Sequence, residues 1–448
     1  MGGMKMENHG KKPSSVGGQR GITRRTFGAT LLAGAAAVPV VGARSVFAAD
    51  SENVLRVGFV SPRTGALGTF GEGDPYLLDI TRKALAGGLK IGEKTYKVEI
   101  YDRDSQSDPA RAGQLAKSLI ADQKIDFMLV TSTPEVVNPV ADTCEAAGVP
   151  CLSTVMPWEA WYFGRGGKPG QPSPFKWTYH FSFGGAQFAG MYISQWNLIP
   201  TNKKVGIMYP NDADGNAIRG GLPGAFKGAG FTVVDPGPFE DLTTDYSAQV
   251  ALFKKEQVEI INLVVLPPDF ATFWRQAAQQ GLAKTVKIVE PAKAGSNPSE
   301  IEALGDIGIN VAGGGPWNRT FPYKSPVTGM DGNALADGYE AATGKQVNQE
   351  LGASMAIFDA GIEALKATAN PTDKAGLAKT LSTLNVTTTV GLIDFNKSPM
   401  PNVIATSPIL GMQWVKADAG SKFKLKQVVT ENAGDPNVPV TQKLVAYS

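Results

Sequence analysis

One stretch, residues 125–165, constrains what this chain can fold into more than any other. A short apolar run at 127–130 leads into small polar residues, and the segment 135–147 then repeats apolar residues at spacings of three and four, which is typical of an amphipathic helix. Gly148 is a helix-stop signal, and a second apolar run at 149–152 follows it. The order strand, loop, helix, strand predicts part of a parallel α/β sheet.

Two loops of this stretch carry residues suited to bind a ligand, because ligands of open α/β sheets lie outside the carboxyl ends of the strands. The first loop holds Ser132 and Thr133, which can donate hydrogen bonds to a ligand or act as turn and N-cap residues. The second holds Val155, Met156 and Trp158. The Trp158 ring offers a large flat contact to an apolar ligand, or it packs as local core under the Gly- and Pro-rich loop that follows. We predict the binding site at these two loops.

Strand and helix signals alternate along the rest of the chain. The run 258–266 is apolar and β-branched without a break, as in a strand buried on both faces. A second α/β series starts at Lys204, and strand signals recur even after this series looks complete. This recurrence predicts two α/β lobes joined by extended crossings. The expected strands are 54–60, 96–101, 179–183, 204–209, 231–234, 260–266, 286–290, 307–312, 389–395 and 409–416, and the expected helices are 76–86, 110–122, 218–229, 246–255, 270–280, 352–369 and 375–384. We expect the glycines 313–315 to form a bend before Trp317.

Residues 1–49 have the character of an export signal rather than of a folded element. A basic region leads to Arg24 and Arg25 before Phe27, then to an apolar stretch at 31–41 and to small residues suited to a signal peptidase. The paired arginines resemble the bacterial twin-arginine signal, although a basic start for ordinary secretion is the alternative. No cysteine follows the apolar stretch, so we expect a free periplasmic protein without a lipid anchor.

The basic character of the chain resides largely in this leader. Residues 1–49 hold seven Lys or Arg and one acid, so the remainder has 36 basic and 40 acidic residues and a net charge of about −4. This balance argues against a nucleic-acid partner, which usually requires a basic patch or stripe. No run of about 18 apolar residues lies outside the leader, so we expect no membrane span in the mature protein.

The only two cysteines are Cys144 on the predicted helix 135–147 and Cys151 on the strand after it. An oxidising compartment allows them to form a disulfide. A neighbouring helix and strand can also hold the two Cα atoms beyond the roughly 7 Å limit for that bond. The sequence leaves both states open.

An exported enzyme is the rival class of protein. His180 is the sole histidine after the leader, so a Ser-His-Asp triad or a multi-histidine zinc site would have to be built from one histidine and two cysteines. No GxSxG, HExxH, Walker A or GxGxxG pattern occurs after the leader. A carboxylate-pair hydrolase remains as a remote alternative, since acids are plentiful.

Four features together resemble the type I periplasmic substrate-binding proteins of ABC importers, in particular the leucine/isoleucine/valine-binding branch. They are the export signal, the opening VLRVGFVSPRTGALGTFGEGD, the unit IDFMLVTSTPEVVNPVADTCEAAGVPCLST and the second start KKVGIMYPNDADGNA. The resemblance covers essentially the whole mature chain. It implies two Rossmann-like lobes joined by a three-crossing hinge, with 50–182 plus 318–400 as lobe 1 and 183–317 plus 401–448 as lobe 2. It also implies a ligand enclosed by closure of the lobes.

The resemblance adds ligand-binding candidates to the two loops. Phe70 matches the aromatic residue that the family places after its first strand. The family's second-lobe aromatics fall near Asp214 and Leu266, and its acid for the ligand ammonium corresponds to Glu290, or to Ala292 with a small shift of the alignment. Prolines at 134 and 157 remove backbone N–H donors that amino-acid binders of the family use.

We therefore predict a monomeric receptor without cofactor or metal that passes a small solute to a membrane permease and performs no catalysis. The replacement of polar contacts by Trp158, Phe70 and Leu266 favours an apolar, aromatic carboxylate or amide. A branched-chain or aromatic amino acid is the alternative, and it would require Glu290 to face the ligand. Trp317, beside the predicted glycine bend, is a further candidate contact, while Arg63 and Arg165 are candidates to hold a carboxylate.

Overall fold

The computed structural model describes residues 53–397, 399–400 and 402–447. The predicted export signal at 1–49 lies outside these residues and stays a prediction. Within the described part of the chain, no helix combines the length and apolar character needed to cross a bilayer.

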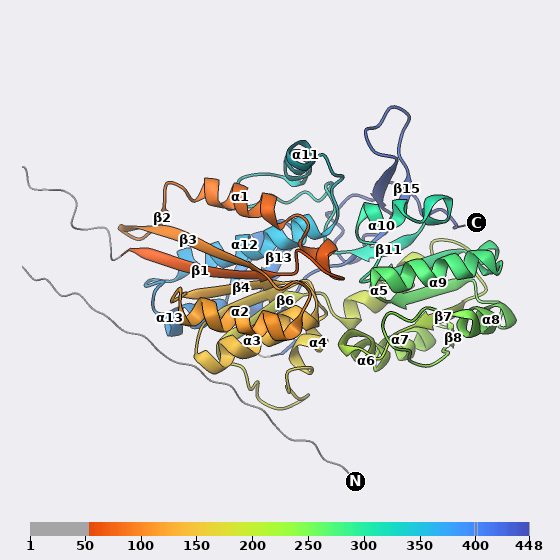
Figure 1. Ribbon diagram of the computed structural model, residues 1–448, viewed down its shortest axis with the longest axis horizontal. Coiled ribbons are helices and arrows are strands. Elements are labelled where there is room, and N and C mark those ends of the chain that lie inside the picture. Colours follow the sequence, from red (N-terminus) through yellow and green to blue (C-terminus); the bar gives the residue numbers. More distant parts are fainter. Residues whose placement is uncertain (1–52, 398, 401, 448) are drawn as a thin grey trace, which may run out of the picture. The chain divides into compact units, whose positions relative to one another are not determined.

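The first sheet has seven strands in the order β14-β6-β5-β4-β1-β3-β2, all parallel except for the antiparallel pair β2 and β3. Helices cover both of its faces, α1 and α12 on one side and α2 and α3 on the other (Figure 1). We call this part lobe 1. Its strands are β1 (Val54–Ser61), β2 (Leu89–Ile91), β3 (Lys94–Asp104), β4 (Phe127–Thr131), β5 (Cys151–Thr154), β6 (Thr178–Ser182) and β14 (Ile404–Thr406), and its main helices are α1 (Asp74–Ala84), α2 (Pro109–Ala121), α3 (Pro134–Ala147) and α12 (Glu350–Ala367).

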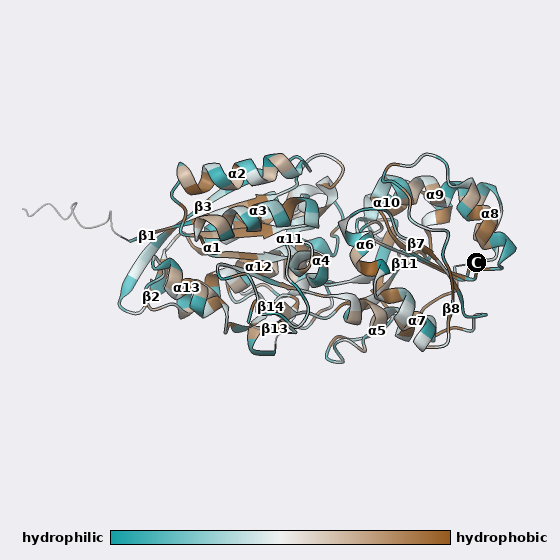
Figure 2. Ribbon diagram, turned by 90° about the horizontal axis from the view of Figure 1, so that it is seen from below, coloured by the Kyte–Doolittle hydropathy of each residue, from teal (hydrophilic) through white to brown (hydrophobic). Residues whose placement is uncertain are grey.

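The second sheet has four parallel strands in the order β10-β9-β7-β8, and a three-stranded antiparallel sheet, β11-β15-β16, accompanies it in lobe 2. One core packs the four-stranded sheet against α5 and α7, and another packs it against α8 and α9. In Figure 2, β7 is largely apolar, whereas α8 and α9 alternate between polar and apolar residues. The strands are β7 (Lys204–Met208), β8 (Thr232–Val234), β9 (Ile260–Val264), β10 (Ile288–Ala292), β11 (Ala312–Gly315), β15 (Leu410–Lys416) and β16 (Leu425–Val429), and the helices are α5 (Gly185–Trp196), α6 (Ala213–Arg219), α7 (Leu222–Gly228), α8 (Ser247–Lys255), α9 (Pro267–Gln279) and α10 (Pro298–Glu302).

The remaining elements are short or belong to the edges of lobe 1. They are α4 (Trp158–Tyr162), α11 (Gly332–Thr343), α13 (Lys374–Leu381), the hairpin β12 (Asn385–Thr388) and β13 (Gly391–Asp394), and four 3-10 turns at Gly68–Gly71, Leu282–Lys284, Gly305–Gly308 and Phe395–Lys397.

The two α/β lobes that the sequence predicts are confirmed, and the chain passes between them three times. It leaves lobe 1 after β6, returns after β11, and leaves again between β14 and β15. The last crossing differs from the predicted boundary at residue 400, because β14 pairs with β6 in the sheet of lobe 1. A strand of three residues is too short for its pattern to reveal which sheet it joins.

The unit on which the sequence analysis depends is confirmed as β4, α3 and β5. Gly148 ends α3 in the left-handed region at φ 65°, and its N–H donates to the carbonyls of Cys144 and Glu145. This conformation carries no steric penalty for glycine.

Three local predictions are wrong. The glycines 313–315 form strand β11, paired with β15, rather than a bend, while residues 307 and 308 of the expected strand 307–312 lie in the 3-10 turn Gly305–Gly308. The predicted helix 218–229 is two helices, α6 and α7, because Gly220 and Gly221 interrupt it. The sequence analysis also omits α5 and α11, although Phe188, Tyr192 and Trp196 recur every four residues in α5.

Candidate functional site

The candidate site is a narrow pocket between the two lobes, which we call the interlobe pocket. It has about 750 Å³ of space free of protein atoms, open solvent included, but only about 60 Å³ can hold the centre of a water molecule. Its lining comes from the carboxyl ends of β4 and β5 in lobe 1 and of β9 and β10 in lobe 2, together with β11 and the start of α12. This is the place where open α/β sheets bind ligands.

Aromatic rings of lobe 1, of the first crossing and of α5 in lobe 2 form the apolar wall of this pocket. Phe70, Phe183 and Phe188 line it, and the last two pack edge to face with their ring centres 4.8 Å apart. Phe188 also stacks on Tyr192, and Tyr192 stacks on Trp196, along one face of α5. The rings are therefore held in place from behind, as an anchor for a flat ligand requires.

The backbone is strained where the strands meet the pocket. Ser132, Val155 and Lys293 follow β4, β5 and β10 directly or by one residue, and their φ angles are 117°, 86° and 69°. A positive φ is a genuine outlier for a β-branched residue such as Val155. Strain of this kind costs on the order of 1–3 kcal/mol per residue and gathers at functional sites.

One ammonium group at the pocket is shared by three carboxylates. Lys293 Nζ lies 2.7 Å from Asp212 Oδ2, 3.2 Å from Asp214 Oδ2 and 3.4 Å from Glu135 Oε1. Burial raises the pKa of Asp214 to about 7, and the neighbouring carboxylates of Glu135 and Asp212 act in the same direction against the opposing effect of Lys293. The three acids lie within 4.8 Å of one another, a grouping that would suit a divalent cation. The Lys293 ammonium already contacts all three carboxylates, so we assign no metal to this cluster.

A second acid faces the pocket from the start of α12. Glu350 is 5% exposed and lines the interlobe pocket, and its Oε2 has no hydrogen-bond partner among the described residues. Burial raises the pKa of Glu350 to about 8, and the nearby carboxyls of Glu300 and Asp74 contribute to this rise.

Five of the ten ligand-binding residues predicted from the sequence line the interlobe pocket. They are Phe70, Thr133, Val155, Met156 and Asp214. Ser132 does not line it, and its side chain is fully buried beneath the pocket with no hydrogen-bond partner for Oγ among the described residues.

Trp158, Leu266 and Trp317 also lie away from the pocket lining. Trp158 is half-buried and packs against Phe163, with ring centres 5.7 Å apart. Leu266 packs with the core of lobe 1. Trp317 is 1% exposed and lies on α12 at Gly352, where a Cβ atom would overlap its ring. All three side chains therefore pack against core residues. For Trp158, packing as local core is the alternative that the sequence left open.

Glu290 lies deeper in lobe 2 than the prediction requires. It is fully buried, accepts a short hydrogen bond from Trp196 Nε1, and does not line the interlobe pocket. Burial raises its pKa to about 8. Ala292, the alternative position in the alignment, does line the pocket, and it has no acid to offer a ligand ammonium.

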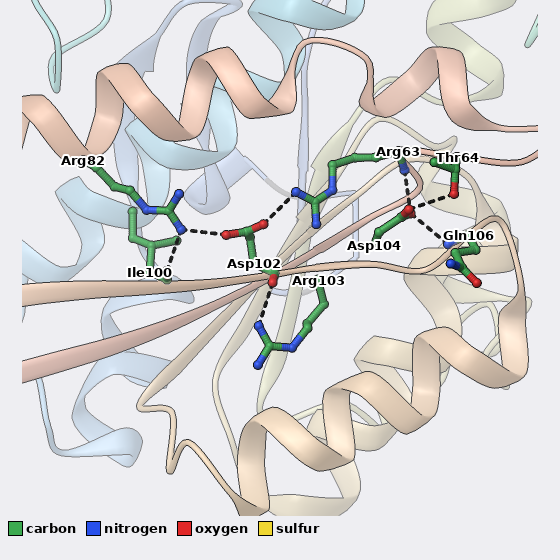
Figure 3. A network of polar contacts seen from close by, with 8 residues as sticks. All are labelled: Arg63, Thr64, Arg82, Ile100, Asp102, Arg103, Asp104 and Gln106. Atoms are coloured by element: carbon green, nitrogen blue, oxygen red, sulfur yellow. Dashed lines mark hydrogen bonds and ion pairs between the residues drawn. The ribbon is translucent and has the colours of Figure 1, made fainter.

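The two arginines considered as carboxylate binders are engaged elsewhere. Arg63 Nη1 donates to Asp102 Oδ2 at 2.6 Å, within a network that also includes Arg82 (Figure 3). Arg165 donates to Asp142 Oδ1 at 2.7 Å and lies over the ring of Trp161. Neither arginine lines the pocket.

His180 and the two cysteines belong to the core of lobe 1. The His180 ring lies 3.0 Å from the Met156 carbonyl and 2.9 Å from Ser153 Oγ, and burial lowers its pKa to about 3, so it is neutral. Cys144 and Cys151 are buried as free thiols, and burial raises the pKa of Cys144. A buried thiol of this kind is unreactive.

Sequence reasoning missed several residues that line the pocket, among them Phe183, Phe188, Lys293, Gln349 and Glu350. The four-residue spacing of rings in 188–196 is the one signal that indicates an aromatic helix face. Gln349 and Glu350 follow an irregular segment, and no local pattern sets them apart from solvated polar residues.

Comparison with known proteins identifies a family and several structures of the same fold. A family model described as periplasmic binding protein matches residues 54–419. A solute-binding protein of an ABC transporter from Rhodopseudomonas palustris, solved in complex with 3,4-dihydroxybenzoic acid, is similar with a TM-score of 0.65 and 19% identity over 85% of this chain and 99% of that chain.

Two amino-acid receptors have the same fold. A leucine-binding protein from Thermotoga maritima gives a TM-score of 0.68 and 17% identity over 85% of this chain and 99% of that chain. A branched-chain amino-acid transporter substrate-binding protein from Streptococcus pneumoniae was solved in complex with isoleucine. It gives a TM-score of 0.64 and 17% identity over 84% of this chain and 99% of that chain.

Proposed function

We propose, because this chain belongs to the periplasmic binding protein family, that it is the solute receptor of an ABC importer. In this proposal it captures a small apolar or aromatic carboxylate or amide in the periplasm and presents it to a membrane permease. Family membership implies the periplasm, and export through the twin-arginine route is part of the proposal.

The observation that carries this proposal is the interlobe pocket itself. Strand ends of both lobes line it, and the three crossings connect the lobes behind it. A pocket built from two bodies loses half of its wall when the bodies separate. Binding and release then follow from opening and closing of the lobes, as in hinge-closing receptors.

The closed arrangement is held by polar contacts across the lobes. Lys293 of lobe 2 contacts Glu135 of lobe 1, and Asn297 Nδ2 of lobe 2 donates to Glu72 Oε2 of lobe 1 at 2.6 Å. These contacts break when the lobes part, so their free energy adds to that of the bound solute in stabilising closure.

The lining favours a flat apolar solute over a highly polar one. The rings of Phe70, Phe183 and Phe188 face the pocket together with the side chains of Val155 and Met156. The aromatic acid in the similar receptor from Rhodopseudomonas palustris supports the same class of solute. A branched-chain or aromatic amino acid is the second candidate, supported by the two amino-acid receptors of the same fold.

The mechanism we propose is binding without covalent chemistry. The one histidine of the described residues is neutral and engaged in the core of lobe 1, away from the pocket. The acids of the pocket are an ion-paired cluster around Lys293 and a single carboxyl at Glu350.

A ligand screen tests the proposal. The purified protein is unfolded and refolded to remove any solute carried through purification, then heated with benzoate, 4-hydroxybenzoate, benzamide, leucine, isoleucine or phenylalanine. A solute that binds only the native state raises the unfolding midpoint. We expect ring compounds without an amino-acid backbone to raise it most. A rise with free amino acids alone would establish the second candidate, and no rise with any small solute would refute the receptor assignment.

A further inference from the structure

We propose that the solute carries N–H donors, as an amine, amidine or amide, and that Glu350 binds this group at the start of α12. The inference rests on the proposed function and revises its solute class, because it keeps the amide, drops the carboxylate and adds amines and amidines. It follows from the balance of donors and acceptors around the interlobe pocket.

The cationic side chains near the pocket are already engaged. Lys293 is the one Lys or Arg among the described lining residues, and it is surrounded by the carboxylates of Asp212, Asp214 and Glu135. Arg63, which follows β1, is paired with Asp102 (Figure 3). A carboxylate solute would therefore enter a pocket with more acidic than basic side chains in its lining and no arginine there to form a bidentate pair.

The helix N-termini that approach the pocket are also satisfied internally. At the start of α12, the N–H groups of Glu350 and Leu351 both donate to Asn348 Oδ1, at 3.0 and 3.2 Å. At the start of α5, Gly184 donates to Gln187 Oε1 and Gly185 to Glu159 Oε1. Such N–H groups are the usual binding site for a carboxylate at a helix, and here they already have acceptors.

Helix α3 completes this pattern, because its first residue is Pro134, which has no N–H to donate. The N–H groups of Val136 and Val137 donate to the Thr133 carbonyl. At all three helix starts, the N–H groups named above therefore already have acceptors and are not free for an anionic solute.

Hydrogen-bond acceptors, by contrast, face the pocket without donors. Glu350 Oε2 and Asp214 Oδ1 are buried carboxyl oxygens with no hydrogen-bond partner among the described residues. The hydroxyl oxygens of Thr133 and Ser296, which also line the pocket, are in the same state. A buried acceptor without a partner costs about 1–3 kcal/mol, more if it is charged. A solute that brings donors removes this cost at the two carboxyl oxygens, whereas the hydroxyls of Thr133 and Ser296 can either accept from a solute or donate to it.

Glu350 is the acid best placed to bind such a group. Asp214 already lies 3.2 Å from the Lys293 ammonium, whereas no cation is paired with Glu350 in the described part of the chain. The pocket lining places Glu350 together with the Phe70 ring. A solute with a ring on one side and a nitrogen group on the other satisfies both.

The test compares three probes that share one ring: benzylamine, benzamide and benzoate. Isothermal titration at pH 8.5, above the pKa of about 8 of the Glu350 carboxyl, measures their affinities for the wild type, for Glu350→Gln and for the control Glu363→Gln. Glu363 is another acid of α12, but it pairs with Lys366 and does not line the pocket. Gln is isosteric with Glu and lacks the charge, so both variants are expected to fold, and circular dichroism checks this.

We expect benzylamine or benzamide to bind the wild type at least tenfold more tightly than benzoate. Glu350→Gln should weaken benzylamine at least tenfold and leave benzoate unchanged or tighter, while Glu363→Gln changes none of the three. If Glu350→Gln weakens the affinity for benzylamine more than that for benzamide, the nitrogen group of the solute is charged. If it weakens the affinity for benzamide more, that group is neutral. Benzoate as the tightest probe, with an affinity that Glu350→Gln does not raise, would overturn the inference and leave the proposed receptor intact. Binding of none of the probes would instead refute the aromatic solute class, and the inference with it.

Discussion

Replacement of Glu290 by glutamine tests whether this carboxyl contacts the solute or lies buried behind the lining of the interlobe pocket. The amino-acid alternative requires Glu290 to contact the solute, whereas the structure buries it behind the pocket. One of its oxygens accepts from Trp196 Nε1, and the other has no hydrogen-bond partner among the described residues. Glutamine keeps an oxygen for Trp196 and removes the ionisable group.

The effect on stability follows from proton linkage. The pKa of Glu290 is about 8 in the folded protein against an ordinary value of 4.5, because burial disfavours the charged form. The native state therefore holds a proton that the unfolded chain releases, and the free energy of unfolding falls as pH rises from about 4.5 to about 8. At about 1.36 kcal/mol per pKa unit, this loss through Glu290 between pH 5 and pH 8 is about 3 kcal/mol.

Urea unfolding at pH 5 and pH 8 measures this difference directly. Between pH 5 and pH 8, the free energy of unfolding of the wild type should fall by about 3 kcal/mol more than that of Glu290→Gln. The other buried acids contribute equally to both proteins, so the comparison isolates Glu290. Glu302→Gln, a change at an exposed acid of α10, serves as the control and should leave the pH dependence as in wild type.

Two results would refute this reasoning. An unchanged pH dependence in Glu290→Gln would mean that Glu290 is ionised in the folded protein and has found a cation or water. A folded Glu290→Gln variant with more than tenfold weaker solute binding would mean that Glu290 contacts the solute, and the pocket would then extend past Ala292.

Three further predictions concern the wall, the ion cluster and the thiols. Phe188→Ala should weaken solute binding by about 2 kcal/mol in isothermal titration because it removes a ring from the wall, while Trp158→Ala changes it by less than about 0.5 kcal/mol because that ring lies outside; equal losses would return Trp158 to the site. Lys293→Met should lower the free energy of unfolding at pH 8 by about 3 kcal/mol, since it leaves buried carboxylates unpaired, and a gain in stability would contradict the ion-pair reading. Thiol titration of the denatured protein should give two free thiols with and without reductant, and no thiols without reductant would establish a bond between Cys144 and Cys151.

The sequence predicted the parts of the fold that local patterns encode. The apolar run of β4, the three- and four-residue spacing of α3 and the stop at Gly148 are all local, so the unit could be placed before any coordinates were known. The rule that ligands lie at the strand ends then located Thr133, Val155 and Met156 correctly in the pocket lining.

Two residues show why the rest of the site could not be predicted. Trp158 follows a strand end closely, but closeness in sequence does not fix the direction of a ring, and this one turns toward Phe163. Glu290 precedes the end of β10 by two residues, which places it about 7 Å deeper in the sheet at about 3.3 Å per residue. An alignment shift of this size decides whether a carboxyl faces a solute or a core.

Glu350 illustrates a different limit. It meets Phe70 and Thr133 at the pocket only because α12 returns to lobe 1 after the chain has passed through lobe 2. No periodicity or spacing in the sequence indicates a contact between segments so far apart along the chain. From the sequence alone, Glu350 therefore cannot be distinguished from a solvent-exposed acid at a helix start.

The glycine strand β11 bears on how a receptor of this build can acquire a new solute. A Cβ atom at Gly314 would collide with Met191 and lie 3.0 Å from Ile409, and one at Gly315 would lie 2.7 Å from the Met412 sulfur. Mutation can exchange rings and acids at the strand ends one at a time, but it cannot add even a methyl group to this floor without moving its neighbours. Substitutions in the walls of the pocket are therefore expected to be tolerated more readily than substitutions in this strand, where the side chains of Met191, Gln349 and Met412 would have to move first.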